Sequence, residues 1–241
     1  GSSSGACCPA GSGDCDDANE TVYPGAQEVC AKRQLEVLEP ALEALLPLGL
    51  PLCVDTRNAR VAAACLDAGA TMINDVSGLD HDAEMAPLLA SRACLAILMH
   101  TRGDPAHMSE RADYRHLLGE VADELAQRVH RGMEAGMSRM QIVLDPGIGF
   151  AKNAAQSRAV VAGCGALRAL GFPLMLGPSR KSFLADLTPG LAPSARDLAS
   201  SDAAAVCAAQ GAAWIRLHDG GGWSGVLAAA NSARADREEC A

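Results

Sequence analysis

Short runs of apolar residues alternate along the chain with longer segments rich in alanine, leucine, glutamate and arginine. The apolar runs lie at residues 51–55, 71–75, 95–100, 141–145, 173–177 and 213–218. They lack the alternation of polar and apolar positions that a half-exposed strand shows, which indicates strands buried on both faces. The segments between them have helical composition and lie at residues 32–46, 60–68, 83–90, 114–135, 157–170, 195–210 and 225–234.

Strands that alternate with helices predict a parallel sheet in which each helix connects two neighbouring strands. Glycine follows three of the helical segments, in DAGA (67–70), EAGM (134–137) and ALGF (169–172), as is typical of helix ends. An open doubly wound sheet fits this alternation, and so does a (β/α)8 barrel of the TIM type. The chain of 241 residues has the length of a single α/β barrel, and we therefore predict the barrel.

Polar residues stand at or just after the carboxyl ends of the predicted strands. They are Asp55, Asn74, His100, Asp145, Gly177 with Ser179, and Arg216 with His218. In a barrel these ends meet on one face, and that face carries the active site. Each residue alone has an ordinary explanation as a helix cap, a turn former or a packed polar side chain. Their recurrence on successive strands favours a binding site.

The chemistry of these groups differs between the middle and the last strands. Asp55, Asn74 and Asp145 offer acceptors, which suit a flat heterocycle that carries amino and ring N–H groups. The last two strands are followed by the donors Ser179, Arg180, Lys181, Arg216 and His218. Loops at this point form the usual phosphate site of the barrel. We therefore expect a ligand with a donor-rich ring at one end and a phosphate or pyrophosphate at the other.

Composition argues against several other classes of protein. The net charge of −9 disfavours a nonspecific nucleic-acid binder, which needs a basic face. No apolar stretch reaches the length of about 18 residues that a membrane helix needs. The chain shows neither a P-loop nor a GxGxxG motif, and its first residues, GSSSG, resemble a cloning scar rather than a secretory signal. A cytoplasmic protein is expected.

Nine of the ten cysteines fall into two groups. Five stand singly in apolar segments, namely Cys53, Cys65, Cys94, Cys164 and Cys207. We expect these to be small buried side chains in a reducing compartment. Four more crowd the first thirty residues, namely Cys7, Cys8, Cys15 and Cys30. They form no CxxC pair and have no nearby histidine, so a zinc site has little support.

Five motifs together resemble the dihydropteroate synthases, a pterin-binding family with the TIM-barrel fold. They are VDTRNARVAAACLDAGATMINDVSGL (54–79), LMHTRGDPAHM (98–108), LDPGIGFAKN (144–153), GPSRKSFL (177–184) and IRLHD (215–219). They follow that family's order and spacing from about Leu35 to the C-terminus. The related methyltetrahydrofolate-dependent methyltransferases share the barrel and its Asp/Asn clasp but are not expected to carry SRKSF or LMHTRG.

The resemblance implies an enzyme of folate biosynthesis. Its reaction joins p-aminobenzoate to 6-hydroxymethyl-7,8-dihydropterin pyrophosphate and releases pyrophosphate, with Mg²⁺ as the cofactor. Cations help the leaving group to depart, and carboxylates stabilise the positive charge that develops on the pterin. The resemblance also makes a homodimer an expectation.

The resemblance further assigns roles to individual residues. It implies that Asp145 and Asn74, with Asp55 beside them, bind the pterin ring and that Lys181 contacts and shields it. The rest of the pterin pocket is implied to consist of Met99 and Phe150 as apolar walls and Gly177 as the point of close approach.

At the other end of the site, Arg216 and His218 are implied to hold the pyrophosphate. Ser179 and the backbone around Arg180 are implied to face p-aminobenzoate. Lys181, Asp145 and Arg216 are the residues expected to act in catalysis.

The first thirty residues depart from the family, and we predict them to be an atypical leader before a barrel domain at residues 31–241. The family's first strand and its loop, which helps to hold Mg²⁺, have no counterpart in the sequence. ANETVYPGAQEV (18–29) retains only part of the second loop, with Val22 and Tyr23 where the family has threonine and arginine. A barrel without its first strand has open edges.

The same leader admits other interpretations. GDCDDANETVYPGAQEVC (13–30) resembles an acidic metal-binding motif, in which Asp14, Asp16 and Asp17 supply oxygen ligands for Ca²⁺. An acidic leader without fixed structure is the alternative. Two functions thus stay open, an active synthase and a noncatalytic pterin-binding protein that keeps the clasp.

Overall fold

A computed structural model describes residues 26–103, 108–220 and 223–239 of the chain. The strands are β1 (Cys53–Asp55), β2 (Met72–Asp75), β3 (Leu95–Met99), β4 (Ile142–Asp145), β5 (Met175–Leu176) and β6 (Trp214–Ile215). Each lies within one of the six apolar runs, so the predicted strands are confirmed.

The helices are α1 (Ala26–Leu45), α2 (Ala59–Ala68), α3 (Met85–Ser91), α4 (Leu117–Glu134), α5 (Ala154–Gly163), α6 (Asp197–Ala209) and α7 (Trp223–Glu239). Short 3-10 turns lie at Leu46–Leu48, Met108–Arg111, Arg139–Gln141, Cys164–Leu170, Ser182–Leu187 and Pro193–Ala195. The predicted segment 157–170 therefore divides into α5 and a 3-10 helix. Near this division, the Gly165 N–H donates to Gln210 Oε1 at 3.0 Å, outside the helix.

The strands follow one another in the sheet in the order of the sequence. Strands β1 to β4 form one parallel sheet, and β5 pairs in parallel with β6. The two parts are joined by a bridge between Leu144 and Leu174, where the Leu144 N–H donates to the Pro173 carbonyl at 2.9 Å. This sequential parallel order is that of a (β/α)8 barrel. Among the described residues no backbone pairing joins β1 to β6, so the wall is open there.

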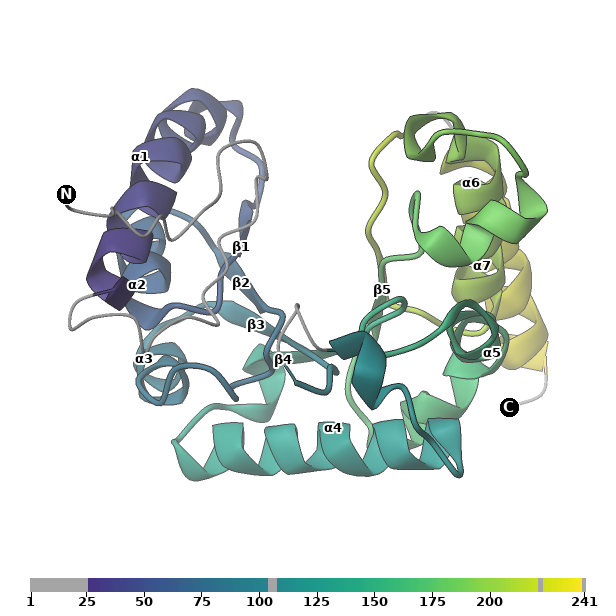
Figure 1. Cartoon of the computed structure of the whole chain (residues 1–241), viewed down its shortest axis with the longest axis horizontal. Coiled ribbons are helices and arrows are strands. Elements are labelled where there is room, and N and C mark those ends of the chain that lie inside the picture. Colours follow the sequence, from purple (N-terminus) through teal and green to yellow (C-terminus); the bar gives the residue numbers. More distant parts are fainter. Residues whose placement is uncertain (1–25, 104–107, 221–222, 240–241) are drawn as a thin grey trace, which may run out of the picture.

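The helices cover the outer side of this curved wall (Figure 1). Helices α1 to α3 lie beside β1 and β2, α4 runs along the base of the view, and α5 to α7 lie beyond β5. The main core lies between strands and helices and includes Leu98 and Leu144, both fully buried. The alternate residues Ile97 and Val143 form a second small cluster with Met175. Strands β2 to β5 are thus buried on both faces, as predicted, whereas the prediction is wrong for β1 and β6, which border the opening and are partly exposed.

The prediction of five buried cysteines is wrong for one of them. Cys65, Cys94, Cys164 and Cys207 are buried, but Cys53 is exposed. Cys53 lies on β1, whose outer edge has no partner strand in the described part of the chain.

The predicted boundary after residue 30 falls within α1 (Ala26–Leu45). Residues 1–25 of the predicted leader, with the proposed metal-binding aspartates, lie outside the described residues. None of the described helices is both long and apolar enough to cross a membrane.

Candidate active site at the carboxyl ends of the strands

The parallel register of β1 and β2 places Asp55 opposite Asn74. Asn74 Nδ2 donates to Asp55 Oδ1 at 2.7 Å. The other end of the amide, Asn74 Oδ1, is buried without a hydrogen-bond partner. A buried acceptor left unpaired costs about 1–3 kcal/mol, so a ligand that donates an N–H to it gains binding energy.

Asp145 ends β4 and lies beside Met99 of β3 in the sheet. Its Oδ1 accepts a hydrogen bond from the Gly147 N–H at 2.8 Å. Burial raises the pKa of the Asp145 carboxyl, and the nearby charge of Lys181 is the strongest opposing influence. Gly147 has φ +66°, and a Cβ there would lie 1.9 Å from the His100 carbonyl oxygen. Only glycine therefore allows the chain to turn directly after this carboxylate.

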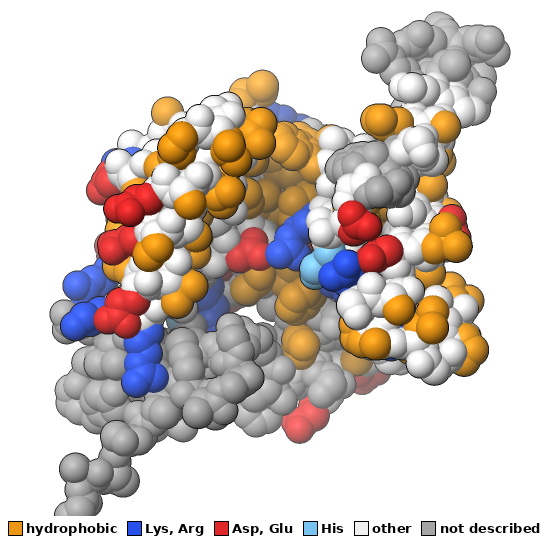
Figure 2. Space-filling view, turned by 90° about the horizontal axis from the view of Figure 1, so that it is seen from above, with side chains coloured by type: hydrophobic (Ala, Val, Ile, Leu, Met, Phe, Trp, Pro, Cys, Tyr) orange, Lys and Arg blue, Asp and Glu red, His pale blue; other side chains and the backbone are white. Residues whose placement is uncertain are grey.

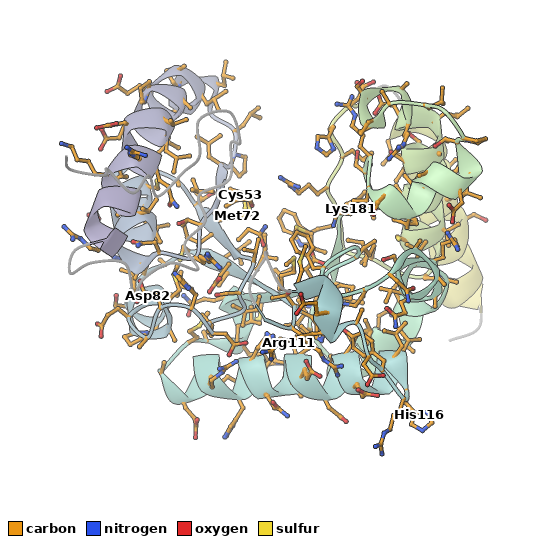
Figure 3. The ribbon with its side chains drawn as sticks, viewed as in Figure 1. Cys53, Met72, Asp82, Arg111, His116 and Lys181 are labelled. Atoms are coloured by element: carbon orange, nitrogen blue, oxygen red, sulfur yellow. The ribbon has the colours of Figure 1, made fainter. Side chains whose placement is uncertain are left out.

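Lys181, in the segment after β5, lies close enough to Asp145 for the two charges to interact. Its ammonium donates to the Ile148 carbonyl and lies 4.7 Å from the centre of the Phe150 ring. Burial lowers the pKa of Lys181 to about 8, while the charge of Asp145 opposes the shift. In Figure 3, Lys181 lies to the right of the centre of the view, and Cys53 of β1 and Met72 of β2 lie to the left of it.

Arg216 follows β6 and contacts the first strand of the sheet. Its Nη2 lies 2.9 Å from Asp55 Oδ2, and both side chains are about half exposed, at 55% and 45%. The ion pair thus spans the two strands that lack a backbone connection. Exposed ion pairs contribute about 0–1 kcal/mol, so Arg216 can exchange this partner for an anionic ligand at little cost.

Ser179 and His218 meet next to Arg216. Ser179 Oγ lies 2.9 Å from His218 Nδ1 and accepts from the His218 backbone N–H at 3.2 Å. The Arg180 guanidinium instead donates to both carboxylate oxygens of Asp197 in α6, at 2.7 and 2.9 Å. The guanidinium of Arg180 is therefore paired with a carboxylate of α6. The role of the Arg180 backbone toward p-aminobenzoate stays a prediction.

A cavity of about 510 Å³ lies between β1 and β6. Its polar lining includes Asp55, Asn74 and Arg216. Its apolar lining includes Leu38, Leu42, Leu52, Ile97, Met175 and Trp214. Figure 2 shows this hollow from above, with hydrophobic walls and with acidic and basic side chains gathered across it. The cavity thus offers apolar walls, the acceptors Asp55 and Asn74, and one cation, Arg216.

The cavity thus brings together three of the predicted polar residues, Asp55, Asn74 and Arg216, whereas Asp145, Lys181, Ser179 and His218 are not among the residues that line it. Met99 is buried beside Asp145. A Cβ on Gly177 would make only an ordinary contact of 3.8 Å with the Arg216 Cβ. The protein alone does not require glycine at residue 177, so the close approach of a ligand there stays a prediction.

Sequence reasoning missed two residues behind the site, Lys152 and Glu124. His100 is fully buried, with Nδ1 2.8 Å from Lys152 Nζ and Nε2 3.0 Å from Glu124 Oε2. Lys152 was visible as the cation of the FAKN sequence, but Glu124 lies in the middle of α4 without a local signal.

A metal site is not formed by the described part of the chain, which contains no group of three or more His, Cys, Asp or Glu side chains that could hold an ion. Asp55 is already engaged by Asn74 and Arg216.

Comparison with known sequences gives consistent matches. The sequence profile of a family described as pterin binding enzymes matches residues 15–218. The dihydropteroate synthase of Synechocystis sp. is 38% identical over 205 residues, which make up 85% of this chain and 71% of that protein. The dihydropteroate synthase of Mycobacterium leprae is 36% identical over 210 residues, covering 85% of this chain and 74% of that protein.

Solved structures match the fold as well. The dihydropteroate synthase of Thermus thermophilus in complex with 6HMPPP superposes with a TM-score of 0.76 at 35% identity, over 85% of this chain and 80% of that chain. The Yersinia pestis enzyme in a sulfonamide complex gives a TM-score of 0.78 at 31% identity, over 86% and 74%. These matches confirm the predicted fold class.

Proposed function

The chain belongs to the dihydropteroate synthase family of pterin-binding enzymes, and from this membership we propose how its own residues carry out the reaction. The site condenses p-aminobenzoate with 6-hydroxymethyl-7,8-dihydropterin pyrophosphate. The unpaired, buried Asn74 Oδ1 is the observation that carries this proposal. It is an acceptor held ready at a hollow whose other polar groups suit a ring with N–H donors and a charged tail.

The pterin ring binds between the acceptors and the loop after β4. Asn74 Oδ1 and the Asp145 carboxylate accept its N–H groups, and Asp55 keeps the Asn74 amide in the required orientation through the 2.7 Å bond. Phe150 and Met99 supply apolar contact. Lys181, held by the Ile148 carbonyl, covers the ring and balances the charge of Asp145.

The pyrophosphate binds to the cations that follow the last two strands. Arg216 leaves Asp55 for the phosphate oxygens, and His218 donates from the ring that Ser179 orients. The amine nitrogen of p-aminobenzoate forms a bond to the pterin methylene carbon while the carbon–oxygen bond breaks. The electron pair leaves with pyrophosphate, and the amine then loses a proton. Lys181 and Arg216 stabilise the leaving charge, and Asp145 stabilises the pterin.

Magnesium is expected from the family resemblance, and it neutralises the pyrophosphate when bound. The described residues do not fit a protein-held ion, because they form no cluster of three ligands. No step of the proposed reaction is therefore routed through the metal.

A noncatalytic pterin-binding protein is the second candidate. It is favoured by the open wall between β1 and β6 in the described part of the chain, because an exposed site admits water.

A cytoplasmic location is also proposed, on the basis of the buried free thiols. The homodimer expected from the family is testable by sedimentation.

A product assay on the purified chain distinguishes these candidates. The assay uses both substrates with and without Mg²⁺, and calorimetry measures pterin binding in parallel. Dihydropteroate formation supports the synthase. Pterin binding without product supports the noncatalytic candidate, and absence of both contradicts the proposed function.

A further inference from the structure

The loop between β4 and α5, residues 146–153, contributes to the candidate pterin pocket. It carries Phe150 and the Ile148 carbonyl that holds Lys181. Three of its residues have positive φ, namely Gly147 (+66°), Gly149 (+80°) and Ala151 (+47°). The left-handed conformation costs a residue with a Cβ about 1–2 kcal/mol, so Ala151 needs contacts that hold it there.

Lys152 contacts the backbone of this loop on the N-terminal side of Ala151. Its Nζ lies 3.2 Å from the Gly147 carbonyl oxygen, 3.1 Å from the Phe150 carbonyl oxygen and 2.8 Å from His100 Nδ1. Burial lowers the pKa of Lys152 to about 7, while the charge of Asp145 opposes the shift. In its charged form the side chain has three N–H donors, one for each of these acceptors. Lys152 is only 7% exposed, so these three acceptors rather than bulk water satisfy its N–H groups.

Glu124 of helix α4 fixes the tautomer of His100 that this contact requires. Glu124 Oε2 lies 3.0 Å from His100 Nε2, and since a carboxylate only accepts, Nε2 carries the proton and Nδ1 is free to accept from Lys152. Burial lowers the pKa of His100 to about 4, consistent with this neutral ring. Arg102 donates to Glu124 through Nε at 2.9 Å and keeps the carboxylate in place.

A second tie comes from Tyr114. Its hydroxyl donates to the Ala151 carbonyl at 3.0 Å, and the Arg102 guanidinium lies 3.9 Å above its ring. The carbonyls of Gly147, Phe150 and Ala151 therefore each accept a hydrogen bond from a side chain, Lys152 for the first two and Tyr114 for the third.

We infer that Lys152 is a positioning residue that holds the loop after β4 in its binding conformation by a tripod of hydrogen bonds to Gly147, Phe150 and His100. The inference rests on the proposed function, because the loop matters through Asp145 and Phe150. A loop ordered in advance loses less entropy when the pterin binds. Loss of the tripod therefore weakens pterin binding, while the rate at saturation changes little.

Lys152→Met tests this inference, since methionine keeps the unbranched stem and removes all three donors. The expected result is a KM for the pterin pyrophosphate and a calorimetric Kd for the same compound that rise about tenfold, equal to about 1.4 kcal/mol. We expect kcat and the KM for p-aminobenzoate to stay near their wild-type values. The amides of residues 147–151 should exchange hydrogen about tenfold faster, while those of β4 keep their protection.

His100→Leu is the second variant, because it removes the acceptor that His100 Nδ1 offers to Lys152. A smaller rise in pterin KM is expected from it. Val160→Ala in α5 is the matched control, a fully buried substitution that lowers stability without touching the tripod. It should leave both KM values unchanged.

The inference is overturned if Lys152→Met folds, keeps the wild-type pterin affinity and leaves the exchange of the loop amides unaltered. It is equally overturned if Val160→Ala reproduces the same rise in KM at the same loss of Tm. If Lys152→Met does not fold, the His100→Leu variant decides. An unaltered pterin KM with unaltered loop exchange overturns the inference, and a selective rise in the pterin KM supports it. A wild-type chain that binds no pterin contradicts the proposed function instead, and loop exchange then decides the role of Lys152.

Discussion

At the scale of single residues, the site is built from polar groups that protein neighbours satisfy only in part. Asn74 uses its donor on Asp55 and leaves its oxygen unpaired. The adjacent Asp75 is different, because its two oxygens accept from the backbone N–H groups of Ser77 and Leu79 at 2.8 and 2.9 Å. Asp75 thus shapes a turn, whereas Asn74 retains an acceptor for a ligand.

Asp145→Asn is expected to abolish pterin binding. The amide replaces one acceptor by a donor that faces the ring N–H groups, and loss of a charged hydrogen bond with an unpaired donor costs about 3 kcal/mol or more, over a hundredfold in Kd. Calorimetric titration with a pterin measures the effect. Asp123→Asn, on an exposed position of α4, is the matched control. Unchanged affinity in Asp145→Asn would contradict the assigned clasp.

Arg216→Met is expected to weaken binding of the pyrophosphate compound by about tenfold to a hundredfold, since a charge-assisted hydrogen bond is lost. Binding of the corresponding pterin alcohol should stay within about twofold, because Arg216 contacts only the charged tail. Calorimetry with both compounds measures this difference. An equal loss for both would place Arg216 at the ring rather than at the pyrophosphate.

At the scale of elements, each strand end is supported by the loop or helix behind it. The buried network of Lys152, His100 and Glu124 connects α4 to the loop after β4. No two of these residues are neighbours in the sequence, so local patterns did not reveal the network. The carboxyl end of β4 is thereby ordered by a helix that precedes it in the chain and packs behind it.

Acid is expected to destabilise the fold through this network. Burial, with the charges of Lys152 and Arg128, lowers the pKa of His100 to about 4 against 6.5 for an ordinary histidine. The unfolded chain therefore binds more protons between these values, and the free energy of unfolding falls as the pH falls from about 6.5 to about 4, by up to about 3 kcal/mol. Urea denaturation across this range measures the slope. His100→Asn should show a smaller slope, and an equal slope would contradict the assignment.

At the scale of the whole molecule, the curved wall has two strands without a backbone partner on one side in the described residues, β1 and β6. The ion pair of Asp55 with Arg216 spans them, and the apolar hollow lies between them. Figure 1 shows the helices on either side of this opening. The residues assigned to the pterin all belong to the wall and not to the first thirty residues.

Removal of residues 1–18 is therefore expected to leave the pterin Kd within about twofold of the full chain, since the residues assigned to the pterin lie elsewhere in the sequence. Calorimetry on both chains measures this. A large loss of affinity would make the leader part of the binding site.

The sequence by itself determined the strands, most of each helix and the set of polar strand ends, because apolar runs and helical composition are visible in short stretches of the sequence. Only the tertiary structure decided which of these groups meet. It paired Arg216 with Asp55, turned Arg180 toward Asp197 and left Cys53 exposed. Such contacts depend on how the wall curves and where it stays open, and no local pattern encodes the distance between residues that lie far apart in the chain.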